Sequence, residues 1–221
     1  ELNKKNHFDF KKISVAFPFF DENEIYSVLE SLLDLKISQG EKTKLFENMF
    51  AKYHGMNAGI AVNSGSSANL VAFSSLMELN KLKKGDEVIV PATTFATVVS
   101  PLYQLGLVPV YIDIEDKNWN IDSKLIEQAI SPKTKAIMPV HTLGFPAEMN
   151  LINQIAKKYN LLVIEDCCEA HGAKYKNHVV GSLSDISTFS FFVAHNITTG
   201  EGGMILTNNS EFEISMRSIR E

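Results

Sequence analysis

The sequence predicts an α/β fold in which a mostly parallel central sheet lies between layers of helices. From Ala58 onward, short runs rich in Val and Ile alternate with helical stretches, the pattern of strands joined by crossover helices. The 221 residues are 45% hydrophobic and 21% charged, so the chain can bury a sizeable core. This composition excludes a disordered, collagen-like or coiled-coil chain.

The N-terminal part predicts two amphipathic helices. Apolar residues recur at helical spacing on one face of each, and Ser38-Gln39-Gly40 between them is typical of a loop. The two stripes are Ile25, Val28, Leu29, Leu32 and Leu33, followed by Leu45, Phe46, Met49, Phe50 and Tyr53. We expect residues 1–57 to form a helical segment that packs on a large domain of residues 58–221.

The large domain is expected to hold a series of short strands separated by turns such as Gly85-Asp86, Gly106-Leu107 and Ser131-Pro132. The expected strands are residues 59–62, 87–90, 108–112, 136–140, 161–164, 187–191 and 204–207. Ligands of such sheets bind beyond the carboxyl ends of the strands, so the residues there are the candidates for function.

The net charge and the cysteine content limit the kinds of ligand and partner that the chain can bind. Lys and Arg number 21 against 26 for Asp and Glu, so no field attracts nucleic acid or an anionic membrane, and an anionic ligand needs local donors. No run approaches the ~18 apolar residues of a membrane span, and the N-terminus lacks the apolar core of a signal peptide, so we expect a cytoplasmic protein. Adjacent Cys167 and Cys168 give no disulfide framework, and no metal site is predicted.

The first candidate site is Asn63-Ser64-Gly65-Ser66-Ser67, between a strand and a helix expected to start near Ala68. A turn of this kind presents free N–H groups and the positive end of a helix dipole to a phosphate. It lacks the Lys and the spacing of a P-loop. Ordinary N-capping by Ser is the alternative interpretation.

The second candidate is Glu165-Asp166-Cys167-Cys168-Glu169, at the end of the most apolar strand. Buried carboxylates are costly unless something pairs with them. They therefore face either a cationic group of a ligand or hydrogen-bond donors of the loop backbone. Phe95, after another strand, either offers a flat face to a planar ring or packs in the core.

The third candidate is His195, which ends an apolar run from Ser190 and precedes a loop rich in Thr and Gly. A lone His in an apolar stretch is more often a satisfied core residue than a catalyst, and only the polar loop favours a functional role. Taken together, the phosphate cradle, the aromatic platform, the strand-end carboxylate and this loop suggest a phosphorylated aromatic cofactor.

In their order along the chain, these segments resemble the DegT/DnrJ/EryC1/StrS sugar aminotransferases, which are fold type I pyridoxal-phosphate enzymes. The motifs are residues 64–68, 91–97, 133–137, 165–166 and 201–203, and the resemblance spans roughly residues 10–221. It implies that Gly65, Ser66, Ser67 and Ser190 hold the cofactor phosphate. It also implies that Phe95 stacks on the ring and that Asp166 pairs with the pyridinium nitrogen.

Two departures point to a subgroup. His195 stands where the aminotransferases carry the Schiff-base Lys, and Glu169 stands where they usually have Gln. Imidazole forms no imine with the cofactor but remains a base for proton transfer. Both changes resemble the nucleotide-sugar 3-dehydratases, which bind pyridoxamine phosphate noncovalently and make deoxysugars for surface polysaccharides such as lipopolysaccharide. The resemblance places Glu169 at the cofactor and makes His195 the base in C3 dehydration of a nucleotide-linked 4-keto-6-deoxyhexose.

Two branches of this chemistry stay open. In one, L-glutamate regenerates the amine cofactor; in the other, an iron-sulfur cluster and a reductase deliver electrons. The cluster cysteines of that branch lie beyond Glu221, so Cys167 and Cys168 are not those ligands. The resemblance also implies a homodimer and a small C-terminal domain that this chain does not include.

Two other interpretations remain. One is an ordinary sugar aminotransferase that has lost its Lys to His195; Glu169 argues against it, because such a change alone would leave Gln in place. Lys174 and Lys176 are poor substitutes, since residues 175–178 predict a hairpin tip. The other is a noncatalytic protein of the same fold.

Overall fold

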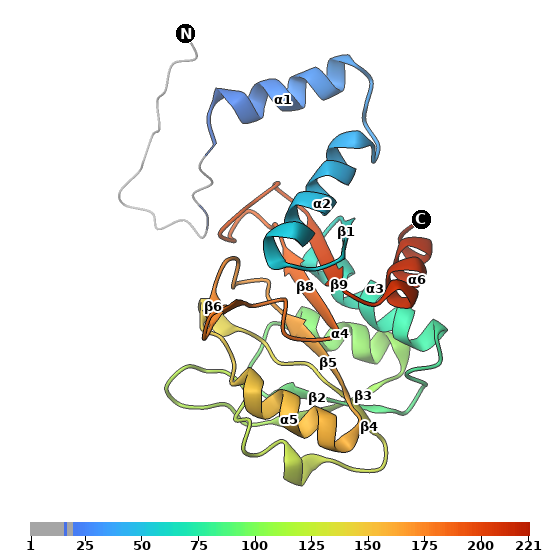
Figure 1. Cartoon of the computed structure of the whole chain (residues 1–221), viewed down its shortest axis with the longest axis vertical. Coiled ribbons are helices and arrows are strands. Elements are labelled where there is room, and N and C mark those ends of the chain that lie inside the picture. Colours follow the sequence, from blue (N-terminus) through green and yellow to red (C-terminus); the bar gives the residue numbers. More distant parts are fainter. Residues whose placement is uncertain (1–15, 17–19) are drawn as a thin grey trace.

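The structure is a computed structural model that describes residue 16 and residues 20–221 of the chain (Figure 1). Its helices are α1 (Glu22–Leu33), α2 (Glu41–His54), α3 (Gly65–Glu78), α4 (Ala96–Leu105), α5 (Met149–Tyr159) and α6 (Ser210–Arg220). Two 3-10 turns, η1 (Glu127–Ala129) and η2 (Thr142–Gly144), lie in the connections. The strands are β1 (Ala58–Val62), β2 (Glu87–Pro91), β3 (Val108–Ile112), β4 (Thr134–Ile137), β5 (Leu162–Asp166), β6 (Lys174–Tyr175), β7 (His178–Val179), β8 (Ile186–Ser190) and β9 (Gly203–Thr207).

The central sheet has seven strands in the order β1-β9-β8-β5-β4-β2-β3. Neighbouring strands from β8 to β3 pair in parallel, and only β9 runs antiparallel to its neighbours β8 and β1. The predicted mostly parallel sheet is therefore confirmed. Strands β6 and β7 form a separate two-stranded hairpin, which confirms the predicted tip.

Helices cover both faces of the sheet because successive strand residues point to opposite sides. Val88 and Val90 of β2 pack in one core with α3, α4 and α6. Ile89, between them, packs in a second core with α5. A third core lies under α2 and contains Phe189 of β8. The result is the predicted layering of helix, sheet and helix.

The N-terminal helices differ in how they meet the sheet. α2 buries Phe50 and Ala51, and its Glu47 carboxylate holds Arg217 (3.0 Å) and Arg220 (2.6 Å) of α6. Of the predicted stripe on α2, Leu45, Met49 and Tyr53 are instead exposed. α1 buries none of its residues against the described chain. Whether residues 1–57 pack as a unit on a complete large domain stays a prediction.

The largest departures from the predicted boundaries are at the end of β4 and the start of α3. Residues 138–140 were expected to continue the strand at 136, but β4 ends at Ile137. Pro139 has no N–H for the ladder, and Val140 joins β5 only through an isolated bridge to Asp166. α3 begins at Gly65 instead of near Ala68, because the Ser64 side chain caps the helix at the N–H of Ser67. In the described part of the chain, no helix is long and apolar enough to cross a membrane.

Candidate functional site

The site lies where the carboxyl ends of β5 and β8 meet the N-terminus of α3. The amide of Asn69 on α3 donates to Asp166 Oδ2 of β5 (3.1 Å) and to the carbonyl of Thr97 on α4 (3.1 Å). Gly65 of α3 lies directly against Ser190, the last residue of β8. The fold therefore brings together predicted residues from segments more than a hundred positions apart.

The first turn of α3 serves both as a capped helix start and as a donor site. The N–H of Ser67 donates to Ser64 Oγ (3.1 Å), and the Ser64 and Ser67 hydroxyls are 3.2 Å apart. Capping by Ser64 is therefore present. The first intrahelical bond in this turn runs from Ala68 N–H to the Ser64 carbonyl (3.0 Å), so Gly65 and Ser66 precede the ladder. Their N–H groups and the helix dipole are suited to an anion.

Gly65 is required by the closeness of this turn to the strand ends. A Cβ at position 65 would lie 2.6 Å from the Ser190 Cβ and 3.0 Å from the Cys168 sulfur. Any side chain there would push α3 away from β5 and β8. Ser190 is buried, and its Oγ accepts a hydrogen bond from the N–H of Phe192 (3.3 Å), which leaves the hydroxyl hydrogen beside this turn.

Asp166 is a buried carboxylate with only neutral partners. It is 4% exposed, and its two oxygens accept hydrogen bonds from Asn69 Nδ2 (3.1 Å) and the N–H of Cys168 (3.0 Å). No Lys or Arg of the described residues forms an ion pair with it. A buried negative charge without a cation is costly, so this position suits a cationic group of a ligand.

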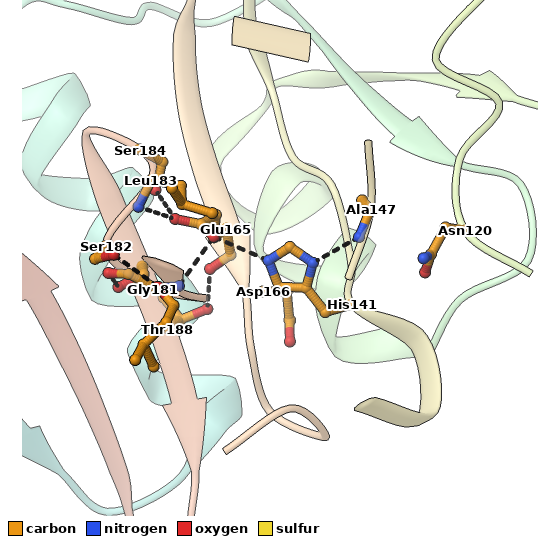
Figure 2. Close-up of polar contacts among 12 residues, drawn as sticks. Asn120, His141, Ala147, Glu165, Asp166, Gly181, Ser182, Leu183, Ser184 and Thr188 are labelled. Atoms are coloured by element: carbon orange, nitrogen blue, oxygen red, sulfur yellow. Dashed lines mark hydrogen bonds and ion pairs between the residues drawn. The ribbon is translucent and has the colours of Figure 1, made fainter. Parts of the chain in front are cut away.

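The neighbouring Glu165 is fully satisfied within the protein (Figure 2). His141 Nδ1 accepts the N–H of Ala147 (3.0 Å), so its Nε2 carries the hydrogen that it donates to Glu165 (2.9 Å). Glu165 accepts three more hydrogen bonds, from Gly181 N–H (2.9 Å), Leu183 N–H (2.9 Å) and Ser184 Oγ (2.7 Å). Burial alone would raise the pKa of Glu165, but these donors hold the pKa below its usual value. Glu165 is thus a structural residue.

The same neighbourhood contains His141, Glu165 and Cys167, whose potential metal-binding atoms lie within 4.8 Å of one another. Both nitrogens of His141 are already used in hydrogen bonds. Burial raises the pKa of the Cys167 thiol well above its usual value, and the adjacent carboxylates add to the shift. The arrangement is therefore explained by packing and hydrogen bonding.

Glu169 lies at the rim and fixes an adjoining loop. Its Oε2 accepts the N–H of Leu143 (2.7 Å), a residue held at a left-handed φ of 52°. From the other side, Asn120 accepts the N–H of Thr142 (2.9 Å) and donates to the Phe145 carbonyl (2.8 Å). The resemblance places Glu169 at the cofactor; in this structure its carboxylate holds the loop through Leu143.

Phe95 and His195 both keep accessible surface in the described chain. Phe95 is 75% exposed at the N-cap of α4, so the alternative that it packs in the core is wrong. His195 is half-buried, and its side chain makes no hydrogen bond to a described residue, so it is not a satisfied core histidine. Its backbone N–H donates to the Phe192 carbonyl (3.0 Å).

Asn69 is the site residue that sequence reasoning missed. It is fully buried on an otherwise apolar face of α3, and its Oδ1 has no partner among the described residues. A polar residue five positions after Ser64, on a buried helix face, was the available signal. Anion donors, a buried carboxylate without a cation, and an exposed ring together fit a phosphorylated aromatic cofactor with a protonated ring nitrogen.

Comparison with known proteins agrees with this geometry. Residues 18–221 match the model of the DegT/DnrJ/EryC1/StrS aminotransferase family. The chain is 41% identical to dTDP-4-dehydro-2,6-dideoxy-D-glucose 3-dehydratase of Saccharopolyspora spinosa, over 91% of this chain and 44% of that protein. It is 43% identical to GDP-perosamine synthase of Caulobacter vibrioides, over 96% and 56% of the two chains. The chain spans about half the length of the curated relatives it matches.

Among solved structures, the E. coli GDP-4-keto-6-deoxy-D-mannose-3-dehydratase with bound hydrated PLP matches with a TM-score of 0.85 and 38% identity. The match covers 91% of this chain and 52% of that chain. This likeness confirms the predicted fold type I architecture.

Proposed function

The chain belongs to the DegT/DnrJ/EryC1/StrS aminotransferase family, and we propose that the whole protein removes the C3 hydroxyl of a nucleotide-linked 4-keto-6-deoxyhexose. Its cofactor in this proposal is pyridoxamine phosphate, interconverting with pyridoxal phosphate. The observation that carries the proposal is His195: an imidazole free of protein hydrogen bonds stands where the aminotransferases carry Lys, in a site that otherwise fits the cofactor.

Each cofactor contact is assigned to a described group. The N–H groups of Gly65 and Ser66 and the hydroxyls of Ser66, Ser67 and Ser190 would hold the phosphate. Asp166 would pair with the ring nitrogen and keep it protonated, with Asn69 orienting the carboxylate. Phe95 would cover one ring face, and Glu169 would lie at its edge.

The chemistry divides between cofactor and protein. When bound, pyridoxamine phosphate supplies an amine for the C4 ketone and a protonated ring that accepts electrons. His195 would remove a proton from the C4′ methylene of the bound cofactor, and an imidazole is suited to this near neutral pH. The C3–O bond breaks as electrons flow toward it, and the hydroxyl leaves as water with the proton that His195 has accepted. The Asp166 carboxylate would keep the ring nitrogen protonated throughout.

Sugar aminotransfer is the second candidate, because the chain is as similar to a perosamine synthase as to a 3-dehydratase. A noncatalytic binding protein is the third. Within the dehydratase proposal two branches stay open: L-glutamate supplies the amine that regenerates the cofactor, or an iron-sulfur cluster and a reductase supply electrons. Burial raises the pKa of Cys168 as well as that of Cys167, which is unfavourable for thiolate ligation of a cluster here.

We also propose a cytoplasmic homodimer with a small C-terminal domain in the whole protein. The outward apolar side chains of α1 and α2 support further packing partners, since Leu29, Leu33, Leu45 and Met49 are exposed in the described chain. A stable, active monomer of the full-length protein in light scattering would contradict the dimer.

Product analysis of the full-length protein tests the function. With pyridoxamine phosphate and a 4-keto nucleotide sugar, the proposal predicts a C3-deoxy sugar. A 4-amino sugar as sole product would favour the aminotransferase, and an unchanged sugar the binding protein. His195→Lys sharpens the choice: it should form a covalent cofactor adduct that absorbs in the visible and survives dialysis, while C3 dehydration falls.

A further inference from the structure

His195 has a half-buried histidine neighbour, His171, that the proposed chemistry has not used. Six buried side-chain nitrogen or oxygen atoms of the described residues lack a hydrogen-bond partner, and three of them belong to His54 and His171. Both ring nitrogens of His171 are among the six. The residue is half-buried, but its ring nitrogens are shielded from solvent without a hydrogen-bond partner, which is costly and requires an explanation.

His171 lies between an aromatic core and His195. Its ring packs against Phe50 (6.4 Å between centroids), Phe189 (5.6 Å) and Phe191 (5.5 Å). The His171 ring also lies beside the ring of His195, with 6.4 Å between the two centroids and 43° between the ring planes. At this separation the two imidazoles can meet through one water or a small side-chain rotation.

His171 is neutral near neutral pH. Burial lowers its pKa to about 4, charges at His195 and His54 act in the same direction, and the nearby Ser190 backbone offsets part of the shift. Burial also lowers the pKa of His54, which is opposed by the Phe50 carbonyl and by Glu165. A neutral His171 has one N–H and one free lone pair.

A base such as His195 needs that kind of neighbour. To accept a proton from C4′, one ring nitrogen must be unprotonated and face the cofactor, and the other carries a hydrogen. The hydrogen bond made by that second nitrogen sets the tautomer and the ring orientation. No side chain of the described residues forms such a hydrogen bond with His195, and of the two aromatic rings beside it, His171 and Phe192, only His171 can accept one.

We propose that His171 is the positioning residue of His195, accepting the hydrogen of its second ring nitrogen and fixing the tautomer that faces the cofactor. This rests on the proposed function of His195 as base. The acceptor also stabilises the imidazolium that forms when His195 takes the proton, since hydrogen bonds to charged groups are stronger. Loss of the acceptor should slow proton removal about 10- to 100-fold.

The test uses three variants of the full-length protein. His171→Phe keeps an aromatic ring among the three phenylalanines but has no acceptor. His171→Gln retains an amide oxygen in reach of the same space. His54→Phe is the matched control: it replaces a histidine that packs on the same phenylalanines, has an unpartnered Nε2 and makes no ring contact with His195.

Two readouts separate positioning from folding. Single-turnover dehydration should fall in His171→Phe, with the KM for sugar and the cofactor Kd unchanged, and should partly recover in His171→Gln. In 15N spectra of histidine-labelled, substrate-free protein, the His195 signals should change from one tautomer to a mixture in His171→Phe only. The acid limb of the pH–rate profile should move in that variant and not in His54→Phe.

An unchanged rate and an unchanged His195 tautomer in His171→Phe would overturn the proposal. It would also be overturned if His54→Phe and His171→Gln lowered the rate as much as His171→Phe, because that indicates general core damage. If the parent performs no dehydration but the His195 tautomer still depends on His171, the pairing stands and the proposed function fails.

Discussion

Glu165 and Asp166 are consecutive carboxylates at the end of β5, equally buried and yet opposite in their surroundings. Glu165 accepts four hydrogen bonds from His141 and the 181–184 turn, and the protein alone satisfies it. Asp166 accepts two, from Asn69 and Cys168, and no cation meets it in the described chain. Strand alternation sends the two side chains to different faces. The number of donors, and not burial, distinguishes a structural carboxylate from one available to a ligand.

The largest expected effect is a loss of folding stability on replacing Glu165, the structural carboxylate of this pair. Glu165→Ala should lower the free energy of unfolding by ~3 to 5 kcal/mol, because it leaves His141 and three donors of the turn buried without an acceptor. Urea unfolding of the cofactor-free protein measures this. A loss below ~1 kcal/mol, the value of one ordinary hydrogen bond, would contradict the structural role.

Asp166→Asn should give the reverse pattern. We expect the unfolding free energy to change by less than ~1 kcal/mol, since one lost hydrogen bond is offset by removal of an unneutralised charge. Dehydration should fall ~100-fold or more, because the ring loses its charge partner. Steady-state rates and cofactor titration check this, and a parental rate would remove Asp166 from its assigned role.

Two serines extend the comparison to the surrounding hydroxyls. Ser190→Ala, on the cofactor side, should raise the cofactor Kd by roughly 10- to 100-fold with little change in stability. Ser184→Ala, on the Glu165 side, should lower stability by about 1 kcal/mol and leave the Kd unchanged. Fluorescence titration of both variants decides the assignment; equal Kd values would place the phosphate away from Ser190.

Acid titration gives the smallest expected effect. The pKa of Glu165 in the folded state lies below its ordinary value of 4.5, so its stabilising contribution is fully present above that value. The contribution is lost as pH falls through the folded-state pKa. The parent should therefore lose more stability than Glu165→Gln on acidification below the ordinary carboxyl range. Parallel unfolding curves for the two proteins across that range would contradict the expectation.

The sequence predicted the layers, the sheet and most strand positions, because Val- and Ile-rich runs and Gly turns are local signals. It also predicted that Gly65, Asp166 and Ser190 meet, since strand ends share one edge. It did not predict which face of α2 is buried, because the ion pairs of Glu47 with Arg217 and Arg220 depend on distant residues. The division of roles between Glu165 and Asp166 was hidden for the same reason, as it depends on donors from His141, Asn69 and the 181–184 turn.

The central claim is that His195 is the base, and single-turnover dehydration by His195→Asn tests it most directly. Asn keeps a polar side chain of similar reach but accepts no proton near neutral pH. We predict that the variant binds pyridoxamine phosphate nearly as well as the parent and dehydrates a 4-keto nucleotide sugar ~100- to 10,000-fold more slowly, the usual contribution of a general base. Dehydration at the parental rate would show that His195 is not the base and would contradict the dehydratase assignment.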